Sequence, residues 1–164
     1  MSELRTNRIV PRDGLPSGAS GGIIQTKMGV TTSQSVSTSG NWDATSLQVS
    51  ITPTRSDSKI LIMCSGGMNG AAGGSAGETY GYKIYKSVGG GSYAETESSA
   101  WGQSVYYGPG NEYTNLSINY LDSPSTTSSV TYKLYQKRIS GSGDASVNRN
   151  NNNQTQMIAM EVSG

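Results

Sequence analysis

The 164-residue sequence contains no histidine, no phenylalanine and only one cysteine. Without histidine, a protein lacks the commonest general base, the usual metal ligand and the usual member of a catalytic triad. The single cysteine, Cys64, excludes an intrachain disulfide. Because it ends the apolar run 59–64, we interpret it as a buried thiol and not as a reactive one. We therefore predict no catalytic residues, no metal site and no cofactor.

Apolar residues and an excess of charge are also scarce. Hydrophobic residues make up 33% of the chain, and 12 basic residues nearly balance 11 acidic ones. No basic stripe is visible, so we predict no nucleic-acid partner. No run approaches the roughly 20 apolar residues of a membrane helix, so we predict no membrane insertion. The first 14 residues carry charges and a proline where a signal peptide needs an apolar run, which indicates synthesis in the cytosol.

Glycine and tyrosine are abundant, at 22 and 10 residues. Tyrosine combines apolar area with a polar tip, which suits strands that are half in water or line a subunit contact. Few apolar residues and no disulfide leave a thin core, and small scaffolds of this kind are often stabilised by association. We therefore expect the chain to form an oligomer with itself.

Residues 1–22 differ in pattern from the rest. Their apolar residues Leu4, Ile9 and Val10 alternate with basic ones, and Pro11 breaks any regular element. Residues 15–22 have the glycine and serine composition of a flexible linker. We predict an extended N-terminal arm and linker over 1–22, followed by one domain over 23–164.

Strand patterns recur throughout residues 23–164. Apolar residues alternate with polar ones at 47–51, 80–84, 116–120, 130–136 and 158–162. Residues 59–65 are almost continuously apolar, which predicts a central strand covered on both faces. Glycine- and serine-rich turns fill 66–77, 89–91, 108–110, 122–124 and 141–153, and no helical period of useful length appears. The pattern predicts an all-β fold, an antiparallel β-sandwich that is jelly-roll-like, although it does not give the strand order.

Two exposed-looking groups are candidates for surface recognition. The first is aromatic, Trp101, Tyr106 and Tyr107, in a stretch rich in glycine and serine; covering the edge of a small core is the alternative role. The second is the polar run that contains Asn150, Asn151 and Asn152, for which a solvated hairpin loop is the alternative. The glycine-dense residues 66–74 lack the Lys-Ser/Thr ending of a phosphate loop and are interpreted as a loop between strands.

Several segments resemble a known group of proteins. They are residues 2–14, 21–25, 47–53, 58–62, 120–127 and 158–162. In this order they resemble the small tail-fibre-like structural proteins of marine and cyanobacterial phage particles. The resemblance covers both ends and the middle of the chain. It implies a place in the virion, after synthesis in the host cytoplasm, and suggests a homotrimer; it brings no catalytic residues with it.

This resemblance gives the arm an expected role. We expect it to anchor the protein to another virion protein of the tail or capsid, by adding a strand to an exposed sheet edge. The anchoring residues would be Leu4, Arg5, Asn7, Arg8, Ile9, Val10, Pro11 and Arg12. The sandwiches, packed through tyrosine-rich faces, would then display many weak sites for a host surface glycan or protein. Two alternatives remain: a capsid decoration or head-fibre protein, and a small hydrolase acting on surface polysaccharide with carboxylates distant in sequence.

Overall fold

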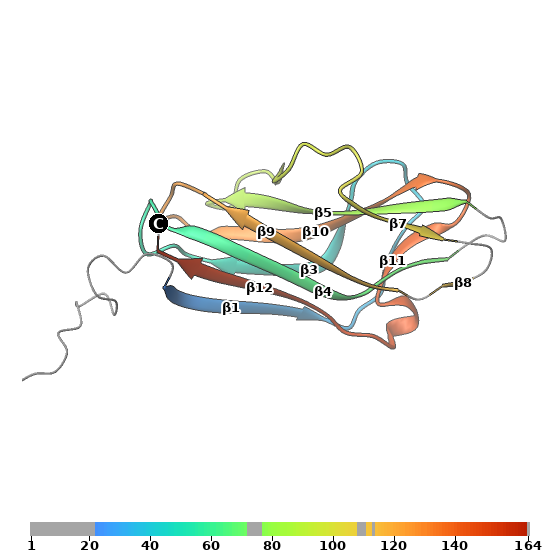
Figure 1. Ribbon diagram of the computed structural model, residues 1–164, viewed down its shortest axis with the longest axis horizontal. Helices are drawn as coiled ribbons and strands as arrows, with labels where there is room; N and C mark the ends of the chain where they lie inside the picture. The colour runs from blue at the N-terminus through green and yellow to red at the C-terminus, as the bar shows by residue number, and fades with distance from the viewer. Residues whose placement is uncertain (1–21, 72–76, 108–110, 113, 164) are drawn as a thin grey trace, which may run out of the picture.

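The computed structural model describes residues 22–71, 77–107, 111–112 and 114–163 (Figure 1). Its elements are β1 Ile23–Thr31, β2 Ser35–Ser37, β3 Asp43–Ile51, β4 Lys59–Ala71, β5 Glu78–Val88, β6 Ala94–Glu95, β7 Gln103–Tyr107, β8 Asn111–Glu112, β9 Asn115–Asp122, β10 Val130–Ser140, β11 Asp144–Val147, the 3-10 turn η1 Arg149–Asn151 and β12 Thr155–Val162. The described residues include no α-helix, which confirms the all-β prediction.

The strands form two antiparallel sheets packed on each other, as the sequence predicts (Figure 1). In the first sheet, β1, β12 and β4 are neighbours, and the first half of β4 pairs with β9 on its other side. The second half of β4 pairs with β8 and β11, and β2 lies beyond β11. In the second sheet the order is β3-β10-β5, with β6 and β7 both on the far edge of β5.

The core lies between the two sheets and is built by alternate residues of the long strands. On β3, Leu47, Val49 and Ile51 are buried while the residues between them are exposed. The same alternation on β10 and β12 sends every second side chain inward. The fully buried apolar side chains include Leu47, Ile60, Ile62, Cys64, Met68, Tyr80, Tyr82, Val130, Tyr132, Leu134, Val147 and Met157.

Three tyrosines occupy core positions where other proteins use phenylalanine. The rings of Tyr80, Tyr82 and Tyr132 are fully buried. Each hydroxyl nevertheless has an acceptor: Tyr80 donates to Glu78, Tyr82 to the Ser146 carbonyl at 3.0 Å, and Tyr132 to Asp122 at 2.8 Å. Because a buried hydroxyl is costly unless it is bonded, these acceptors allow a core without phenylalanine. These three tyrosines serve the core and are not available for a subunit contact.

Strand β4 differs from its prediction in two ways. It is central, but it is covered on one face only: Ile60 and Ile62 face the core, whereas Met63 is 40% exposed on the other side. The strand also continues to Ala71, through glycines that we had interpreted as a loop. Gly66 has φ +143°, and a Cβ there would lie 2.6 Å from the Gln154 carbonyl oxygen, so glycine permits the close pairing with β12.

Candidate recognition surface

Four aromatic side chains gather on the outer face of the second sheet. Tyr85 of β5 and Tyr135 of β10 stack with ring centroids 4.0 Å apart and an interplanar angle of 27°. Trp42, in the segment between β2 and β3, lies 6.3 Å from Tyr85, and Tyr93, after β5, lies 6.0 Å from Tyr135. We call these four residues the aromatic cluster. The two tilted pairs fall in the roughly 4.5–7 Å range of favourable ring pairs, and the stacked pair is closer still.

The strand alternation that builds the core also places this cluster. Tyr132, Leu134 and Gln136 of β10 are buried between the sheets, so the residues between them point outward. In the register of β10 against β5, Tyr135 pairs with Lys83 and Lys133 pairs with Tyr85. Aromatic and lysine side chains therefore alternate diagonally on the face, and the two tyrosines are brought into contact.

Three lysines lie over the rings of the cluster. The ammonium nitrogens of Lys83 and Lys137 are 4.9 and 4.6 Å from the centre of the Trp42 ring, and that of Lys133 is 5.3 Å from the Tyr93 ring. These distances are those of cation–π contacts. Burial, together with the nearby Lys83 charge, lowers the pKa of Lys137. The face thus combines ring surfaces with positive charge.

The segment between β5 and β7 folds over one side of the cluster and fixes Lys83. This lysine is 1% exposed and donates to Glu95 Oε2 at 3.0 Å and to the Ser99 carbonyl at 2.5 Å. The other carboxylate oxygen of Glu95 accepts from the Tyr85 hydroxyl at 2.9 Å. Bonding to Lys83 and Tyr85 lowers the pKa of Glu95, while burial and the Glu95 hydrogen bond raise that of Tyr85. Lys133 and Lys137 are less enclosed and carry the positive charge of the face outward.

A glycine under the cluster makes this arrangement possible. A Cβ at Gly81 would lie 2.5 Å from the Trp101 carbonyl oxygen and 3.2 Å from the Trp42 ring. Such distances are shorter than van der Waals contact, so any side chain there would displace the tryptophan ring and the chain at residue 101. Gly81 therefore belongs to the site, although the sequence pattern alone did not indicate it.

The structure places the predicted recognition residues in different parts of the molecule. Trp101 is 56% exposed and borders the aromatic cluster, because Lys137 donates to the carbonyl of the preceding residue, Ala100, at 2.7 Å. Tyr106 and Tyr107 belong to β7, a strand that the sequence pattern missed, and their side chains lie outside the described part of the structure. The arm residues from Leu4 to Arg12 also lie outside the described residues.

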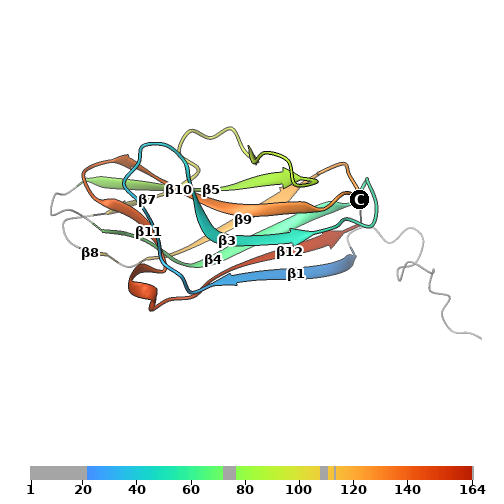
Figure 2. The same ribbon diagram turned by 180° about the vertical axis from the view of Figure 1, so that it is seen from behind.

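The asparagine group lies far from this surface. Asn150 and Asn151 are in η1, beside the first sheet, whereas the segment between β5 and β7 covers the second sheet (Figures 1 and 2). Asn151 Oδ1 accepts from the Gln34 backbone at 2.7 Å, and Asn150 and Asn151 adopt positive φ, as a tight turn requires. Asn152 follows as the C-cap of the turn. The structure therefore does not join Asn150, Asn151 and Asn152 with Trp101 in one site.

Sequence reasoning missed Trp42, Tyr85, Tyr93 and Tyr135, the members of the aromatic cluster. A signal for two of them was present: Tyr135 and Tyr85 occupy outward positions of alternating strands, where polar residues are usual. An aromatic residue at such a position indicates a surface with a use beyond the core. The other two lie in connecting segments, so no periodicity could have placed them.

The buried carboxylates of the protein are committed to the fold. Glu78 accepts from the Gly143 backbone at 2.9 Å and from both the backbone and the hydroxyl of Ser142. Asp122 pairs with Lys86 at 2.7 Å and accepts from Tyr132. Burial raises the pKa of Glu78, but its hydrogen bonds outweigh this and hold the pKa below the usual value. Glu78 therefore stays ionised, and both carboxylates serve as anchors for turns and strands.

Neither a metal cluster nor a membrane-spanning helix is found among residues 22–71, 77–107, 111–112 and 114–163. Within them, no three or more acidic, cysteine or histidine side chains are grouped so that they could hold a metal ion. Within them as well, no helix has the length and apolarity needed to cross a membrane.

Comparisons with known proteins add little detail. No protein-family model and no curated protein matches this chain. Among solved structures, a chain from the structure of infectious bursal disease virus, Gx strain, aligns with 97% of this chain at 12% identity and a TM-score of 0.42. The alignment covers 45% of that chain, so this protein spans less than half of its length.

Proposed function

We propose that this chain is a non-enzymatic structural subunit of a bacteriophage particle that displays its β-sandwich for attachment to a host surface. In this proposal it is tail-fibre-like and is held to another virion protein by residues 1–22. The observation that carries the proposal is the outer side of the aromatic cluster, where Tyr93, Tyr135, Lys133 and Lys137 are partly exposed and Lys83 and Tyr85 are buried beneath them. This surface lies on the outside of a rigid sheet, where it can meet a ligand without any change of the core.

The order of the long strands supports the proposal. We assign β1-β12-β4-β9 and β3-β10-β5-β7 to the two four-stranded sheets of a jelly roll, with β2, β6, β8 and β11 as additions. Jelly rolls occur in viral capsid domains and in lectins. The architecture alone does not give a function, but it suits a subunit that both assembles and binds.

The chemistry of the cluster favours an acidic glycan as the ligand. Ring faces offer apolar area to the C–H groups of a sugar, and Trp101 extends this area at the border of the cluster. Lys133 and Lys137 supply positive charge for a carboxylate or sulfate group. Several copies in one appendage would convert a weak single contact into firm attachment.

The absence of an enzymatic role is part of the same proposal. The buried acids Glu78, Asp122 and Glu161 accept hydrogen bonds from fixed turns and tyrosines, and burial raises the pKa of Glu161 less than its bonds to Gln25 and Thr54 lower it. A general acid for glycoside cleavage needs the opposite, a raised pKa. Glu78 and Glu161, whose pKa values are lowered, are therefore poor candidates for hydrolysis of a bound glycan.

The proposal is tested with surface polysaccharide isolated from the host strain. We expect the purified chain to bind it, and Trp101→Ala and Lys133→Glu each to weaken binding by roughly tenfold or more, as expected for loss of an interface aromatic or charge. Lys27→Glu makes the same charge change on β1 of the other sheet and serves as the control. Equal binding by Lys133→Glu, Trp101→Ala and the unchanged protein would contradict the role of the cluster, and release of sugars would contradict the non-enzymatic role.

A further inference from the structure

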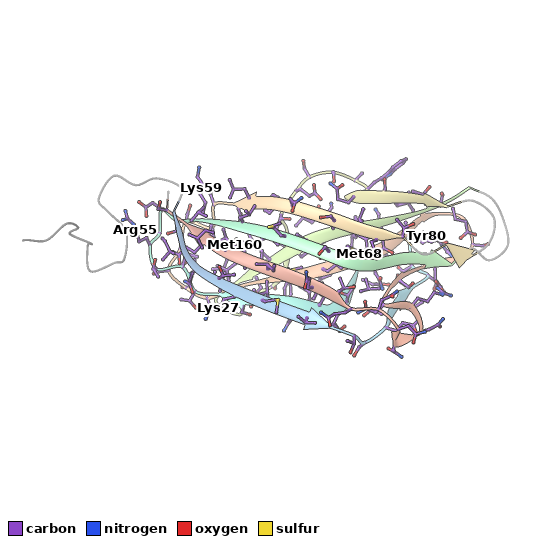
Figure 3. The ribbon with its side chains drawn as sticks, turned by 60° about the horizontal axis from the view of Figure 1, so that its bottom comes forward. Lys27, Arg55, Lys59, Met68, Tyr80 and Met160 are labelled. Carbon is purple, nitrogen blue, oxygen red and sulfur yellow. The ribbon has the colours of Figure 1, made fainter. Side chains whose placement is uncertain are left out.

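Apolar side chains predominate on the outer face of the first sheet where β1, β12, β4 and β9 lie side by side. Residues that pair across its strands point to the same side, so Met28, Ile158 and Met63 form one row across β1, β12 and β4. Met160, Leu61 and Leu121 form the next row, across β12, β4 and β9. The full set, which we call the methionine face, is Ile23, Met28, Val30, Leu61, Met63, Leu121, Ile158, Met160 and Val162. Figure 3 shows these four strands side by side, with Met160 on β12 and Lys59 at the end of β4.

These side chains are accessible to solvent. Met28 is 62% exposed, Ile23 57% and Leu121 52%, and Val30 and Met63 follow at 45% and 40%. Single exposed apolar residues are common, but a contiguous set across four strands is rare on a soluble monomer and marks an interface. This face also explains why β4 is apolar at consecutive positions. The core between the sheets requires an apolar residue only at every second position, and the residues between them belong to the methionine face.

The charge pattern of the face limits what can cover it. The other outward residues of these rows are neutral, namely Thr26, Ser65, Ser117, Asn119 and Gln156. Lys59 pairs with Val162 at the end of the sheet, where its ammonium group can remain in water. A partner must therefore present an apolar, uncharged surface, since a buried unpaired charge would be costly. The face itself meets this requirement.

We infer that the methionine face binds a second copy of this chain, sheet against sheet. Four strands about 4.8 Å apart and about nine residues long give a face of roughly 19 by 30 Å. That area, on the order of 600 Å² per copy, reaches the lower end of stable interfaces, which bury about 600–1,000 Å² per partner. Two such faces would pack as the sheets of a sandwich do, about 10 Å apart, and flexible methionines adapt to each other's shape.

This contact leaves the recognition surface free. The aromatic cluster lies on the outer face of the second sheet and the methionine face on the outer face of the first, so they are on opposite sides of the sandwich, whose two sheets are seen in Figure 1. A twofold pair would therefore carry two aromatic clusters, one on each outer side. The inference concerns assembly alone and does not depend on what the cluster binds.

The test is the mass of the full-length chain in solution, measured by sedimentation equilibrium over a range of concentrations. We expect twice the chain mass of 17.2 kDa. Met63→Lys and Leu121→Lys should each weaken the association by roughly tenfold or more, because each would bury a charge in the contact. Both positions are already exposed, so the fold should persist, which a melting curve verifies. Val88→Lys is the matched control, because Val88 is 41% exposed at the end of β5, in the second sheet.

Three results would overturn the inference. One is a monomer at every concentration, which would mean that another segment or another protein covers the face. A second is a trimer, because a twofold contact between flat faces closes with two copies. The third is a dimer whose association is unchanged by Met63→Lys and Leu121→Lys.

Discussion

Glu161 offers the sharpest test of how this thin core is held together. Its carboxylate is fully buried at the end of β12. Oxygen Oε1 accepts from the backbone and the hydroxyl of Thr54, both at 2.7 Å, and Oε2 accepts from Gln25 Nε2 at 2.6 Å. One side chain thus joins β12, β1 and the turn that leads from β3 to β4. We therefore expect that loss of this carboxylate weakens the contacts among these three segments and lowers the free energy of unfolding.

The substitution Glu161→Gln keeps the shape and removes the charge. A carboxamide has one accepting oxygen, so its NH₂ group must face a donor, either at Thr54 or at Gln25. Rotating the Gln25 amide would not help, because its NH₂ group also donates to the Thr52 carbonyl at 2.7 Å. Hydrogen bonds to a charged group contribute about 1.5–3 kcal/mol and neutral ones about 0.5–1.5 kcal/mol. Weakening two bonds by about 1 kcal/mol each and losing one of about 1.5–3 kcal/mol would cost about 3.5–5 kcal/mol. Because a neutral amide costs less to bury than a carboxylate, part of this loss is offset, and the free energy of unfolding should fall by about 2–4 kcal/mol.

The assay is urea unfolding of both proteins at neutral and acidic pH. Hydrogen bonds hold the pKa of Glu161 in the folded protein below its ordinary value of 4.5. The stabilisation by ionised Glu161 is therefore complete above pH 4.5 and is lost as the pH falls through the folded-state pKa. Because glutamine does not titrate, the difference between the two proteins should shrink over the same range. Glu78 and Glu95 also have lowered pKa values, but they titrate in both proteins and cancel in the difference.

The control is Asp57→Asn, which removes a carboxylate whose side chain is 55% exposed and pairs with Arg55 at the surface. Its stability should stay close to that of the unchanged protein, since exposed ion pairs contribute little. If Glu161→Gln unfolds at the same urea concentration as the unchanged protein at pH 7, this account of the carboxylate is wrong. A gap that stays constant as the pH falls below 4.5 would equally refute it.

Three further predictions concern the core, the sheet contact and the arm. Burial raises the pKa of Cys64 to about 12, so the native thiol should resist a thiol reagent, and Cys64→Ser should lower stability by about 1–3 kcal/mol without changing ligand binding. Loss of binding with unchanged melting would contradict this. In Gly29→Ala the new Cβ would lie 1.9 Å from the Gln48 carbonyl oxygen, so thermal unfolding should show a loss of about 1–3 kcal/mol, whereas Gly40→Ala, with no atom within 4 Å, should melt normally. Deletion of residues 2–14 should leave the sandwich folded but absent from assembled particles, and incorporation of the shortened chain would end the anchoring idea.

Most strands could be predicted from the sequence because the alternation of apolar and polar residues is a local property. Leu47, Val49 and Ile51 are buried as their spacing predicts, as are Tyr132 and Leu134. The strand order could not be predicted, because it depends on residue pairs such as Ile23 with Val162, which lie near opposite ends of the described chain. No local signal selects such a partner from among several similar strands.

The surfaces show where the sequence misleads. The apolar run of β4 predicted a strand that is buried on both faces, whereas one of its faces is partly exposed. The spacing of apolar residues does not show whether a face is buried by the same chain or remains an exposed apolar surface. The aromatic cluster depends on two connecting segments that bring Trp42 and Tyr93 to the stacked pair Tyr85 and Tyr135. Contacts of that kind arise only once the sheets are assembled. The sequence therefore predicted Trp101, at the border of the aromatic cluster, and none of the four residues that form it.

The central claim is that this chain is a structural component of a virion. The most direct measurement is its copy number in purified particles of the phage that the proposal expects to encode it, determined by quantitative mass spectrometry against the major capsid protein. The account predicts a fixed ratio of tens of copies or fewer per particle, in keeping with a tail appendage. Hundreds of copies would favour the capsid decoration role instead, and absence from purified particles would contradict the account.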